Sequence, residues 1–397
     1  MNLRAMPALQ TRDIAPPPPP RLARLLLAIL ARLQVGRLDL ITPDGGLRAF
    51  VGLDPGPQAT LRIHDWRVCS DVLRAGDIGF AESWIQKRWD TPDLANLLAL
   101  AAANHAALGA AVYGRWWGSL FYRLRHLFRG NSRAQAKRNV HAHYDLGNAF
   151  YALWLDPTMT YSSAMFEGHL DRPFEEAQAV KYERILEQLG IGAGDSVLEI
   201  GCGWGGFAEH AVRSRGCKVH GITLSREQLA YARERLRKTG CAEHATVELR
   251  DYRDVKGEFD YIVSIEMFEA VGEKYWPQFF RVVRDRLKKG GRAIVQTISI
   301  ADGLFARYRV GTDFFQQYIF PGGMLPSPSR FASAAAASGL KTTDRFDFGQ
   351  DYARTLETWL WSFERARPQI LSLGYDEKFI RMWRFYLAAC IAGFRTG

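Results

Sequence analysis

Beyond residue 180, short runs of apolar and β-branched residues alternate with longer segments of helical periodicity. In residues 226–238, for example, apolar positions recur three and four residues apart, as on one face of a helix. Alternating strands and helices predict an α/β fold with a doubly wound, mostly parallel sheet, which is a Rossmann-like arrangement. The strands are expected at residues 196–200, 218–222, 246–249, 261–265 and 292–297.

The first 140 residues follow a different pattern. A proline run at 16–20 predicts an extended spacer, so we expect residues 1–20 to be flexible. Residues 21–38 then read as a short basic amphipathic helix. The uncharged run 94–114 is too weakly apolar for a membrane span and predicts a buried helix instead. These patterns predict a smaller α+β domain at 21–138, ahead of a larger domain at 139–397.

Charge is unevenly divided between these two parts. The chain carries a net charge of +10, and residues 1–140 hold 19 basic against 10 acidic side chains. Between Arg115 and Arg138 there are seven Lys or Arg residues, interleaved with aromatic residues and without an acidic one. This composition suits nucleic acid, through stacking and phosphate contacts, or an anionic bilayer, where Trp and Tyr lie at headgroup depth. A solvated helix face is the third interpretation, and the segment alone leaves all three open.

The cysteines and the N-terminal sequence indicate in which cellular compartment the protein is expected. Five cysteines in 397 residues are too few and too scattered for a disulfide framework or a CxxC metal site. The apolar stretch nearest the N-terminus is interrupted or flanked by Arg24 and Arg32, which argues against a secretory signal. The sequence therefore predicts a reducing, cytoplasmic environment and no metal.

A glycine-rich turn follows the first predicted strand of the larger domain. Residues 199–206 read Glu-Ile-Gly-Cys-Gly-Trp-Gly-Gly and open a helical segment. Glycines allow a sharp turn and a close approach of ligand to backbone, and Glu199 can meet a cationic amino group. The third glycine of a dinucleotide motif is displaced, and no Lys-Ser/Thr pair follows to form a P-loop.

This turn resembles the first motif of class I methyltransferases that use S-adenosylmethionine. The resemblance implies that the methionine end of the cofactor lies on the glycines. It also implies that residues after the second and third strands meet the ribose and the adenine. The cofactor-binding residues implied are Tyr161, Ser162, Glu199, Gly201, Gly203, Gly205, Thr223, Leu224, Gln228, Asp251 and Tyr252.

Several separated motifs, from about His141 to the end, resemble the cyclopropane-fatty-acid synthase family. They include residues 143–148 (His-Tyr-Asp-Leu-Gly-Asn), 160–163 (Thr-Tyr-Ser-Ser) and 319–323 (Ile-Phe-Pro-Gly-Gly), in the family's order. Residues 76–84 resemble the smaller N-terminal domain of the branch that acts on bacterial phospholipids. The resemblance implies a class I methyltransferase with a seven-stranded type of sheet. The chain ends short of the family's usual closing segment, which leaves the last strand in doubt.

The family's chemistry starts with a cis double bond of a phospholipid acyl chain attacking the sulfonium methyl group. A base then removes a proton from the resulting carbocation. Loss from the added methyl gives a cyclopropane fatty acid, the product predicted here, whereas loss or rearrangement elsewhere gives a methylene- or methyl-branched acid, the alternative. Aromatic residues within 305–320 and 359–363 are expected to line a dry tunnel for the cation, with ordinary core packing as the alternative.

The predicted base pocket departs from the family pattern. Members of the cyclopropane synthase family usually hold a bicarbonate ion as the base. Its pocket is formed by a Cys, a Glu-His pair, another His and a Tyr. The matching positions here are Ser163, Glu269-Ala270, Gln296 and Tyr352, with Ile298 offering its backbone. Both histidines and the cysteine are replaced, and Glu266 stands where the family has Gly.

We therefore predict that Glu266, on one helical face with Glu269, supplies the base, with bicarbonate as the doubtful alternative. Tyr352 and Gln296 are expected to orient this carboxylate by hydrogen bonds. The alternative interpretation is that Glu266 has no catalytic role and lies at the surface or caps a helix. The motif around Glu266 resembles the branch that makes methylene- or methyl-branched fatty acids, as in tuberculostearate formation. Cys390 matches a family cysteine and is interpreted as packing rather than as a nucleophile.

The family resemblance decides among the partners left open above. We expect phospholipid acyl chains at an anionic membrane surface, peripheral association with the inner leaflet and no nucleic acid. A homodimer is a further expectation, as is a partner reductase if the product is methyl-branched. The competing functions are a degenerate lipid-binding module, which has no need of the intact glycine turn, and a nucleic-acid methyltransferase, for which the base-flipping motif is missing.

Overall fold

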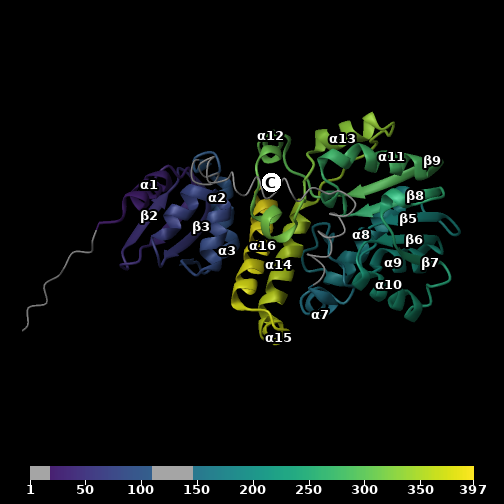
Figure 1. Cartoon of the computed structure of the whole chain (residues 1–397), viewed down its shortest axis with the longest axis horizontal. Helices are drawn as coiled ribbons and strands as arrows, with labels where there is room; N and C mark the ends of the chain where they lie inside the picture. The colour runs from purple at the N-terminus through teal and green to yellow at the C-terminus, as the bar shows by residue number, and fades with distance from the viewer. Residues whose placement is uncertain (1–17, 110–145) are drawn as a thin grey trace, which may run out of the picture.

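The computed structural model describes residues 18–109 and 146–397, which form two structural units (Figure 1). The first unit contains a four-stranded mixed sheet in the order β2-β1-β3-β4. Its elements are α1 (Arg21–Leu30), β1 (Val35–Ile41), β2 (Leu47–Val51), β3 (Asp54–Ile63), α2 (Arg67–Ile85), β4 (Trp89–Asp90) and α3 (Leu94–Ala103). The basic segment from Arg115 to Arg138 and the proline run before residue 18 lie outside the described residues.

The helix predicted at 21–38 is wrong in its second half. Helix α1 ends at Leu30, and Val35 begins strand β1. From there the burial alternates, with Leu38 and Leu40 buried and Arg37 exposed, which is the two-residue period of a strand. Gly36 has φ +78, and a Cβ there would lie 2.2 Å from the Pro57 carbonyl oxygen, so only glycine fits where β1 starts.

The buried helix predicted at 94–114 is present over its first ten residues as α3. Asp93 caps its start by accepting a hydrogen bond from the Asn96 N–H. At its end, the buried Asn104 side chain accepts from the Val35 N–H at 3.0 Å and donates to the Val35 carbonyl at 2.9 Å. These bonds tie the end of α3 to the start of β1.

The second unit contains a parallel sheet, as predicted. Its strands run in the order β7-β6-β5-β8-β9. The strands are β5 (Ser196–Ile200), β6 (Lys218–Thr223), β7 (Ala245–Leu249), β8 (Phe259–Ile265) and β9 (Leu287–Gln296), so all five predicted strands are confirmed. Because the order reverses between β5 and β8, the carboxyl ends of these strands form the crevice where such sheets bind ligands.

Helices connect and flank this sheet. The predicted helix at 226–238 is confirmed as α10. The α-helices of the second unit are α7 (Gly147–Ala152), α8 (Phe174–Leu189), α9 (Gly206–Arg215), α10 (Arg226–Lys238), α11 (Trp276–Arg286), α12 (Asp302–Val310), α13 (Pro328–Ala337), α14 (Gly349–Arg365), α15 (Arg367–Ser372) and α16 (Glu377–Thr396). Short helical turns lie at η1 (Tyr252–Asp254), η2 (Phe268–Ala270), η3 (Glu273–Tyr275) and η4 (Phe315–Ile319).

The sheet formed by the described residues has five strands rather than the seven expected. After α13 the chain runs through residues 341–347, which are exposed and form no strand. Four of these seven residues are charged, so the segment has no apolar face that a sheet could bury. The chain then enters the long helices α14 and α16.

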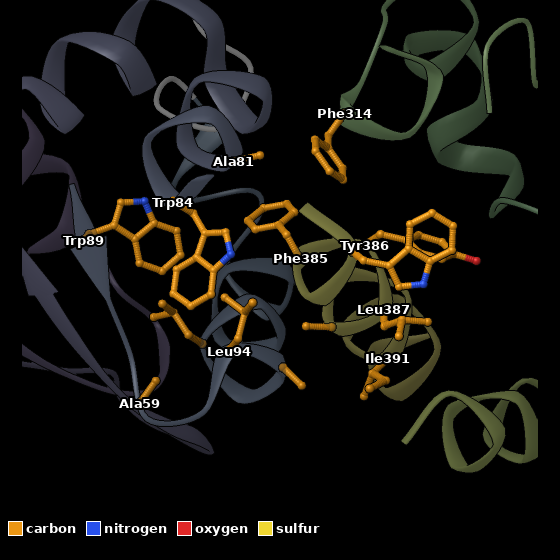
Figure 2. Packing of buried hydrophobic residues seen from close by; sticks show 14 of the residues in the cluster. Ala59, Ala81, Trp84, Trp89, Leu94, Phe314, Phe385, Tyr386, Leu387 and Ile391 are labelled. Atoms are coloured by element: carbon orange, nitrogen blue, oxygen red, sulfur yellow. The ribbon is translucent and has the colours of Figure 1, made fainter. Parts of the chain in front are cut away.

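Helices α14 and α16 of the second unit stand between the first unit and the parallel sheet (Figure 1). Helix α16 packs against α14 on one side and against α2 and α3 on the other. Its side chains Trp383, Phe385, Tyr386 and Leu387 are all buried, because partners cover it on several faces. One continuous core therefore joins the first unit to the C-terminal helices (Figure 2). Within the described ranges, no helix is long and apolar enough to cross a bilayer.

Candidate active site

A pocket lies on the glycine turn at the carboxyl ends of β5 and β6. The Gly201 and Cys202 N–H groups both donate to the Ile222 carbonyl at 3.0 Å, which ties the turn to β6. Gly203 has φ +51 and lines the pocket, and a Cβ built there would meet no atom within 4 Å. The space beside Gly203 is therefore open to a ligand.

The other two glycines of the turn serve the fold more than the pocket. A Cβ at Gly201 would lie 2.9 Å from the Met267 side chain, although Gly201 does line the pocket. Gly205 does not line it, contrary to the prediction for this residue. It caps α9 with φ +82, and a Cβ there would lie 3.1 Å from Ala232, so this glycine is required by helix packing.

Glu199 supplies the charge that the pocket offers to a cofactor. Its side chain is buried, and burial raises the pKa of its carboxyl to about 8. One of its carboxylate oxygens is buried without a hydrogen-bond partner, although Glu199 lines the pocket. A cationic group bound here would pair with that oxygen. The amino group of S-adenosylmethionine fits this requirement.

The predicted ribose and adenine residues also surround this pocket. The Thr223 hydroxyl donates to Gln228 Oε1 at 2.8 Å, so the amide nitrogen of Gln228 remains as the donor. Asp251 is held by Arg253, whose guanidinium donates to both carboxylate oxygens at 2.6 and 2.8 Å. The remaining predicted residues that line the pocket are Tyr161, Ser162, Leu224 and Tyr252.

Glu266 follows β8 and has φ +49, a left-handed conformation that favours glycine. Three donors converge on its carboxylate. Oε1 accepts from the Ser163 N–H at 3.0 Å and from the Gln296 amide at 2.7 Å, and Oε2 accepts from the Tyr352 hydroxyl at 2.5 Å. Ser163 thus acts through its backbone, since its hydroxyl donates to the Ala164 carbonyl. Burial raises the pKa of the Glu266 carboxyl despite these bonds.

Glu269 forms the second half of a carboxylate pair. Its Oε1 accepts from the Thr297 hydroxyl at 2.9 Å and from the Ile298 N–H at 2.5 Å, so Ile298 contributes its backbone as predicted. Burial, followed by the nearby Glu266 charge, raises the pKa of Glu269 to about 7. The expected helical turn does not align the pair, because the left-handed φ of Glu266 lies before η2 begins.

Lys181 of α8 is a functional candidate that sequence reasoning missed. Its side chain is 1% exposed, and its ammonium donates to Ser162 Oγ at 2.5 Å and to Gln178 Oε1 at 2.8 Å. Burial lowers the pKa of Lys181 to about 7, against the charges of Glu266 and Glu199, which raise it. A signal was present, because Lys181 lies on the buried face of α8 with Ala177 and Ile185.

A large cavity of about 1370 Å³ adjoins the cofactor pocket. The two share Tyr161, Glu266 and Ala270 as lining residues. Of the other predicted catalytic residues, Ser163 lines neither pocket. The cavity contacts the rest, namely Glu269, Gln296, Ile298, Tyr352 and Cys390. Burial strongly raises the pKa of the Cys390 thiol, which keeps it protonated and fits its interpretation as packing.

The predicted aromatic wall is only partly correct. Four aromatic residues of the segment 305–320 line the cavity, namely Tyr308, Phe314, Phe315 and Phe320. Phe305 instead belongs to the hydrophobic core beside α11. Trp359 and Phe363 of α14 are also core residues that do not line the cavity. Their rings pack against Trp154 instead.

The sequence has clear relatives. Residues 131–397 match the family model described as mycolic acid cyclopropane synthetase. The chain is 38% identical to tuberculostearic acid methyltransferase UfaA1 of Mycobacterium tuberculosis, over 91% of this chain and 85% of the relative. It is 34% identical to the cyclopropane-fatty-acyl-phospholipid synthase of Escherichia coli K12, over 88% of each chain.

The chain belongs to the mycolic acid cyclopropane synthetase family. A solved structure of mycolic acid cyclopropane synthase CmaA1, complexed with SAH and CTAB, is similar to it. That structure has a TM-score of 0.62 and 32% identity and covers 66% of this chain and 94% of the other. The predicted family, fold class and cofactor are thus confirmed, and the chain is an S-adenosylmethionine-dependent methyltransferase.

Proposed function

We propose that this methyltransferase methylates the cis double bond of an unsaturated fatty acyl chain of a membrane phospholipid, with Glu266 as the base. The observation that carries the proposal is the place of Glu266. It lies where the cofactor pocket meets the large cavity, and three donors hold its carboxylate. The names of two relatives support the substrate class, since they refer to tuberculostearic acid and to fatty-acyl phospholipids.

The cofactor would be held by residues of the smaller pocket. Glu199 would accept a hydrogen bond from its amino group, Gly203 leaves room for the methionine portion, and Gln228 would donate to the ribose. When bound, S-adenosylmethionine supplies an electrophilic methyl group on a positively charged sulfur.

The chain's own residues then protect and complete the reaction. An acyl chain that fills the largely apolar cavity keeps water away from the double bond, and water would otherwise capture a carbocation there. The rings of Tyr161 and Tyr386 line the cavity with their hydroxyls 2.8 Å apart, and their faces favour a nearby cation. Glu266 accepts the proton that leaves this cation, and the Tyr352 and Gln296 donors keep its carboxylate in place.

Glu266 also explains how the site works without the family's usual anion pocket. The Ser163, Gln296 and Tyr352 donors, which could hold a free carbonate-like anion, are used by the protein's own carboxylate. A carboxylate whose pKa is raised is a stronger base than an exposed one, and the charge of Lys181 counteracts part of this rise in pKa. We therefore infer that the reaction needs no added bicarbonate.

Whether the cation rearranges before Glu266 removes a proton decides the product. Loss of a proton from the transferred methyl, with closure of a ring onto the cation, gives a cyclopropane fatty acid, the first product we propose. If a 1,2-hydride shift first moves the cation onto the carbon that carries the new methyl, loss of a proton from that methyl gives a methylene branch, which a reductase converts into a methyl branch. This second product is supported by the 38% identity to a tuberculostearic acid methyltransferase over 91% of the chain. Mass spectrometry of lipids, after expression in a host that lacks such enzymes, distinguishes the two.

The role of Glu266 is tested with Glu266→Gln, which keeps the shape of the side chain and removes its charge. We expect turnover of an unsaturated phospholipid to fall about 100-fold or more, with unchanged affinity for S-adenosylmethionine by calorimetry. Glu258→Gln is the matched control, because Glu258 is exposed and lies before β8. A fully active Glu266→Gln enzyme, or strong stimulation of the wild type by bicarbonate, would return the base role to a bound anion.

A further inference from the structure

The large cavity does not end at the carboxylate pair. It continues into the first unit, where its wall is built by α1, β1, β3, α2 and α3. We call this part the N-terminal chamber. Its wall is formed by aliphatic side chains, among them Leu30, Leu38, Leu61, Val72, Leu98 and Ala101. The core between the helices and the sheet of the first unit therefore encloses space that is continuous with the candidate active site.

Helix α16 connects the chamber to the active site. Phe385 packs against Phe80 of α2 and against Phe314, with ring centroids 6.5 and 4.9 Å apart, at the boundary of the two units (Figure 2). All three rings line the cavity. The next residue, Tyr386, is hydrogen-bonded to Tyr161, which lines both the cavity and the cofactor pocket.

The other end of α16 reaches the exposed end of the cavity. Phe394 stacks on Tyr352 with ring centroids 4.4 Å apart, and Tyr352 holds Glu266. The neighbouring lining residues 345–347 are exposed. At 1.5 Å per residue, Phe385 and Phe394 lie about 14 Å apart along the helix. The cavity thus runs from an exposed mouth, past the carboxylate pair, into the chamber.

Charge determines which end of a lipid can enter the chamber. Asp77 of α2 and Asp313 line the cavity near Phe314, whose N–H donates to Asp77 at 3.2 Å. Among the described lining residues of the first unit there is no Lys or Arg, whereas Arg345 lines the cavity at the exposed mouth. A phosphate or carboxylate is therefore disfavoured at the chamber and has a cation at the mouth.

We propose that the N-terminal chamber binds the methyl end of the acyl chain whose double bond lies at Glu266. The first unit thereby selects substrates by the length of chain beyond the double bond. This inference rests on the proposed function and adds the first unit to the acyl-binding site. The volume supports it, because about 1370 Å³ exceeds the roughly 300–1,000 Å³ usual for small-ligand pockets. Each methylene group of the acyl chain that enters the chamber is also removed from water, which favours binding.

The test narrows the chamber without touching the active site. Ala101 is half-buried and lines the chamber, so Ala101→Phe fills part of it. The substrates are phospholipids with one headgroup and an acyl chain of 16, 18 or 20 carbons. The double bond of each chain lies at carbon 9. We expect Ala101→Phe to lower kcat/KM for the 20-carbon chain about tenfold relative to the 16-carbon chain. Ala49→Phe is the control, because Ala49 of β2 is exposed and outside the cavity.

A second variant tests the opposite direction. Leu98→Ala enlarges the chamber and should raise the ratio of kcat/KM for the 20-carbon chain to that for the 16-carbon chain. Ratios in both variants equal to that of the wild type would overturn the proposal. It would also be overturned if the variants changed the dependence on the length of the lipid's second, saturated chain instead.

A binding measurement separates this inference from the proposed function. The fluorescence of cis-parinaric acid, an 18-carbon polyene, reports its entry into an apolar site without turnover. We expect Ala101→Phe to weaken this binding and Ala49→Phe to leave it unchanged. If the wild type methylates no unsaturated lipid but shows this pattern, the proposed function fails and the chamber stands. If the wild type methylates lipids and Ala101→Phe binds the probe as the wild type does, only the proposal for the chamber is contradicted.

Discussion

At the scale of single residues, Glu266 is held at a cost. Its φ of +49 is a conformation that costs about 1–3 kcal/mol for a residue with a side chain. Its carboxylate is also buried. Three hydrogen bonds, together with the nearby charge of Lys181, offset part of the free-energy cost of burying it. Glycine at this position would avoid the backbone cost, so the glutamate is explained by the charge that it brings to the cavity.

Lys181 should set the pH range in which Glu266 is ionised. The positive charge of Lys181 lowers the pKa of Glu266, which burial raises. Lys181→Met removes that charge, so the Glu266 pKa should rise and less of it should be ionised at neutral pH. We therefore expect the acid limb of kcat against pH to move to higher pH, with little change in KM for S-adenosylmethionine.

Lys181→Arg is the control for charge, since a guanidinium stays protonated. Thermal unfolding of both variants checks the fold. An acid limb at the same pH in Lys181→Met and in the wild type would show that Lys181 only anchors Ser162 and Gln178.

Gly203 should be required for cofactor binding, whereas its replacement costs the fold only the strain of a left-handed backbone, about 1–3 kcal/mol. A valine at Gly203 would place its Cβ in the open space of the pocket without meeting protein atoms. We expect Gly203→Val to lower the affinity for S-adenosylmethionine about 100-fold or more in calorimetry, a loss of about 2.8 kcal/mol. Gly240→Val is matched, because Gly240 has φ +70, also has open space, and lies outside the pocket. Equal affinity in the two variants would remove Gly203 from the cofactor site.

Site residues could be predicted where neighbouring positions along the chain carry the chemistry. The turn from Glu199 to Gly203 is such a case, because its glycines and its acid act together within five residues. Lys181 was missed because a lysine on an amphipathic helix usually faces water. The Tyr352 and Gln296 donors to Glu266 could be predicted, because both match positions of the family's base pocket. The Ser163 N–H donor and the left-handed φ of Glu266 could not, since they depend on backbone geometry that the sequence pattern does not encode.

At the scale of elements, one buried arginine joins the two units. Arg381 of α16 is 8% exposed and stacks over Trp84 of α2, with its guanidinium carbon 3.6 Å from the ring centroid. It donates to the Trp84 carbonyl at 2.6 Å and to the Trp89 carbonyl at 3.2 Å. The Trp84 indole N–H in turn donates to the Arg381 carbonyl at 2.9 Å.

Arg381→Met should weaken this junction, because it keeps the apolar stem and leaves buried carbonyls without their donor. We expect a loss of about 2–4 kcal/mol in the free energy of unfolding, measured by denaturant titration. Arg395→Met is the control from the same helix, where an exposed arginine pairs with Glu357. Its effect should stay below about 1 kcal/mol. Similar losses in both variants would contradict a special role for Arg381.

The strands of the parallel sheet could be predicted because each is a short apolar run between turns. The junction of the units could not, because Trp84 and Arg381 are 297 residues apart in sequence. Helix α16 has apolar residues on several faces, which blurs the period that marks a surface helix. Helix α1 was extended too far because Leu38, eleven residues after Leu27, would lie on the same helical face and also fits the alternating strand β1.

At the scale of the whole molecule, the unit that encloses the chamber exposes several apolar side chains. Leu22 and Leu25 of α1 are each 47% exposed, and Leu53, before β3, is 90% exposed. The net positive charge of residues 1–140 lies mainly in the basic segment from Arg115 to Arg138, outside the described residues. Exposed apolar side chains combined with a basic segment are typical of proteins that lie on anionic bilayers without spanning them.

The full chain should therefore bind anionic phospholipid vesicles in a salt-dependent way. Screening over about 8–10 Å at moderate ionic strength weakens the attraction of exposed charges. Replacing Leu22 and Leu25 by Gln should weaken binding at every salt concentration, because it removes apolar contact and leaves the charge unchanged. Leu373→Gln is the control, since Leu373 is 46% exposed in the second unit. Equal binding of the wild type to neutral and anionic vesicles at low salt would contradict the role of charge. A double variant that binds as Leu373→Gln does would mean that α1 does not face the bilayer, and the basic segment from Arg115 to Arg138 would then have to supply the contact.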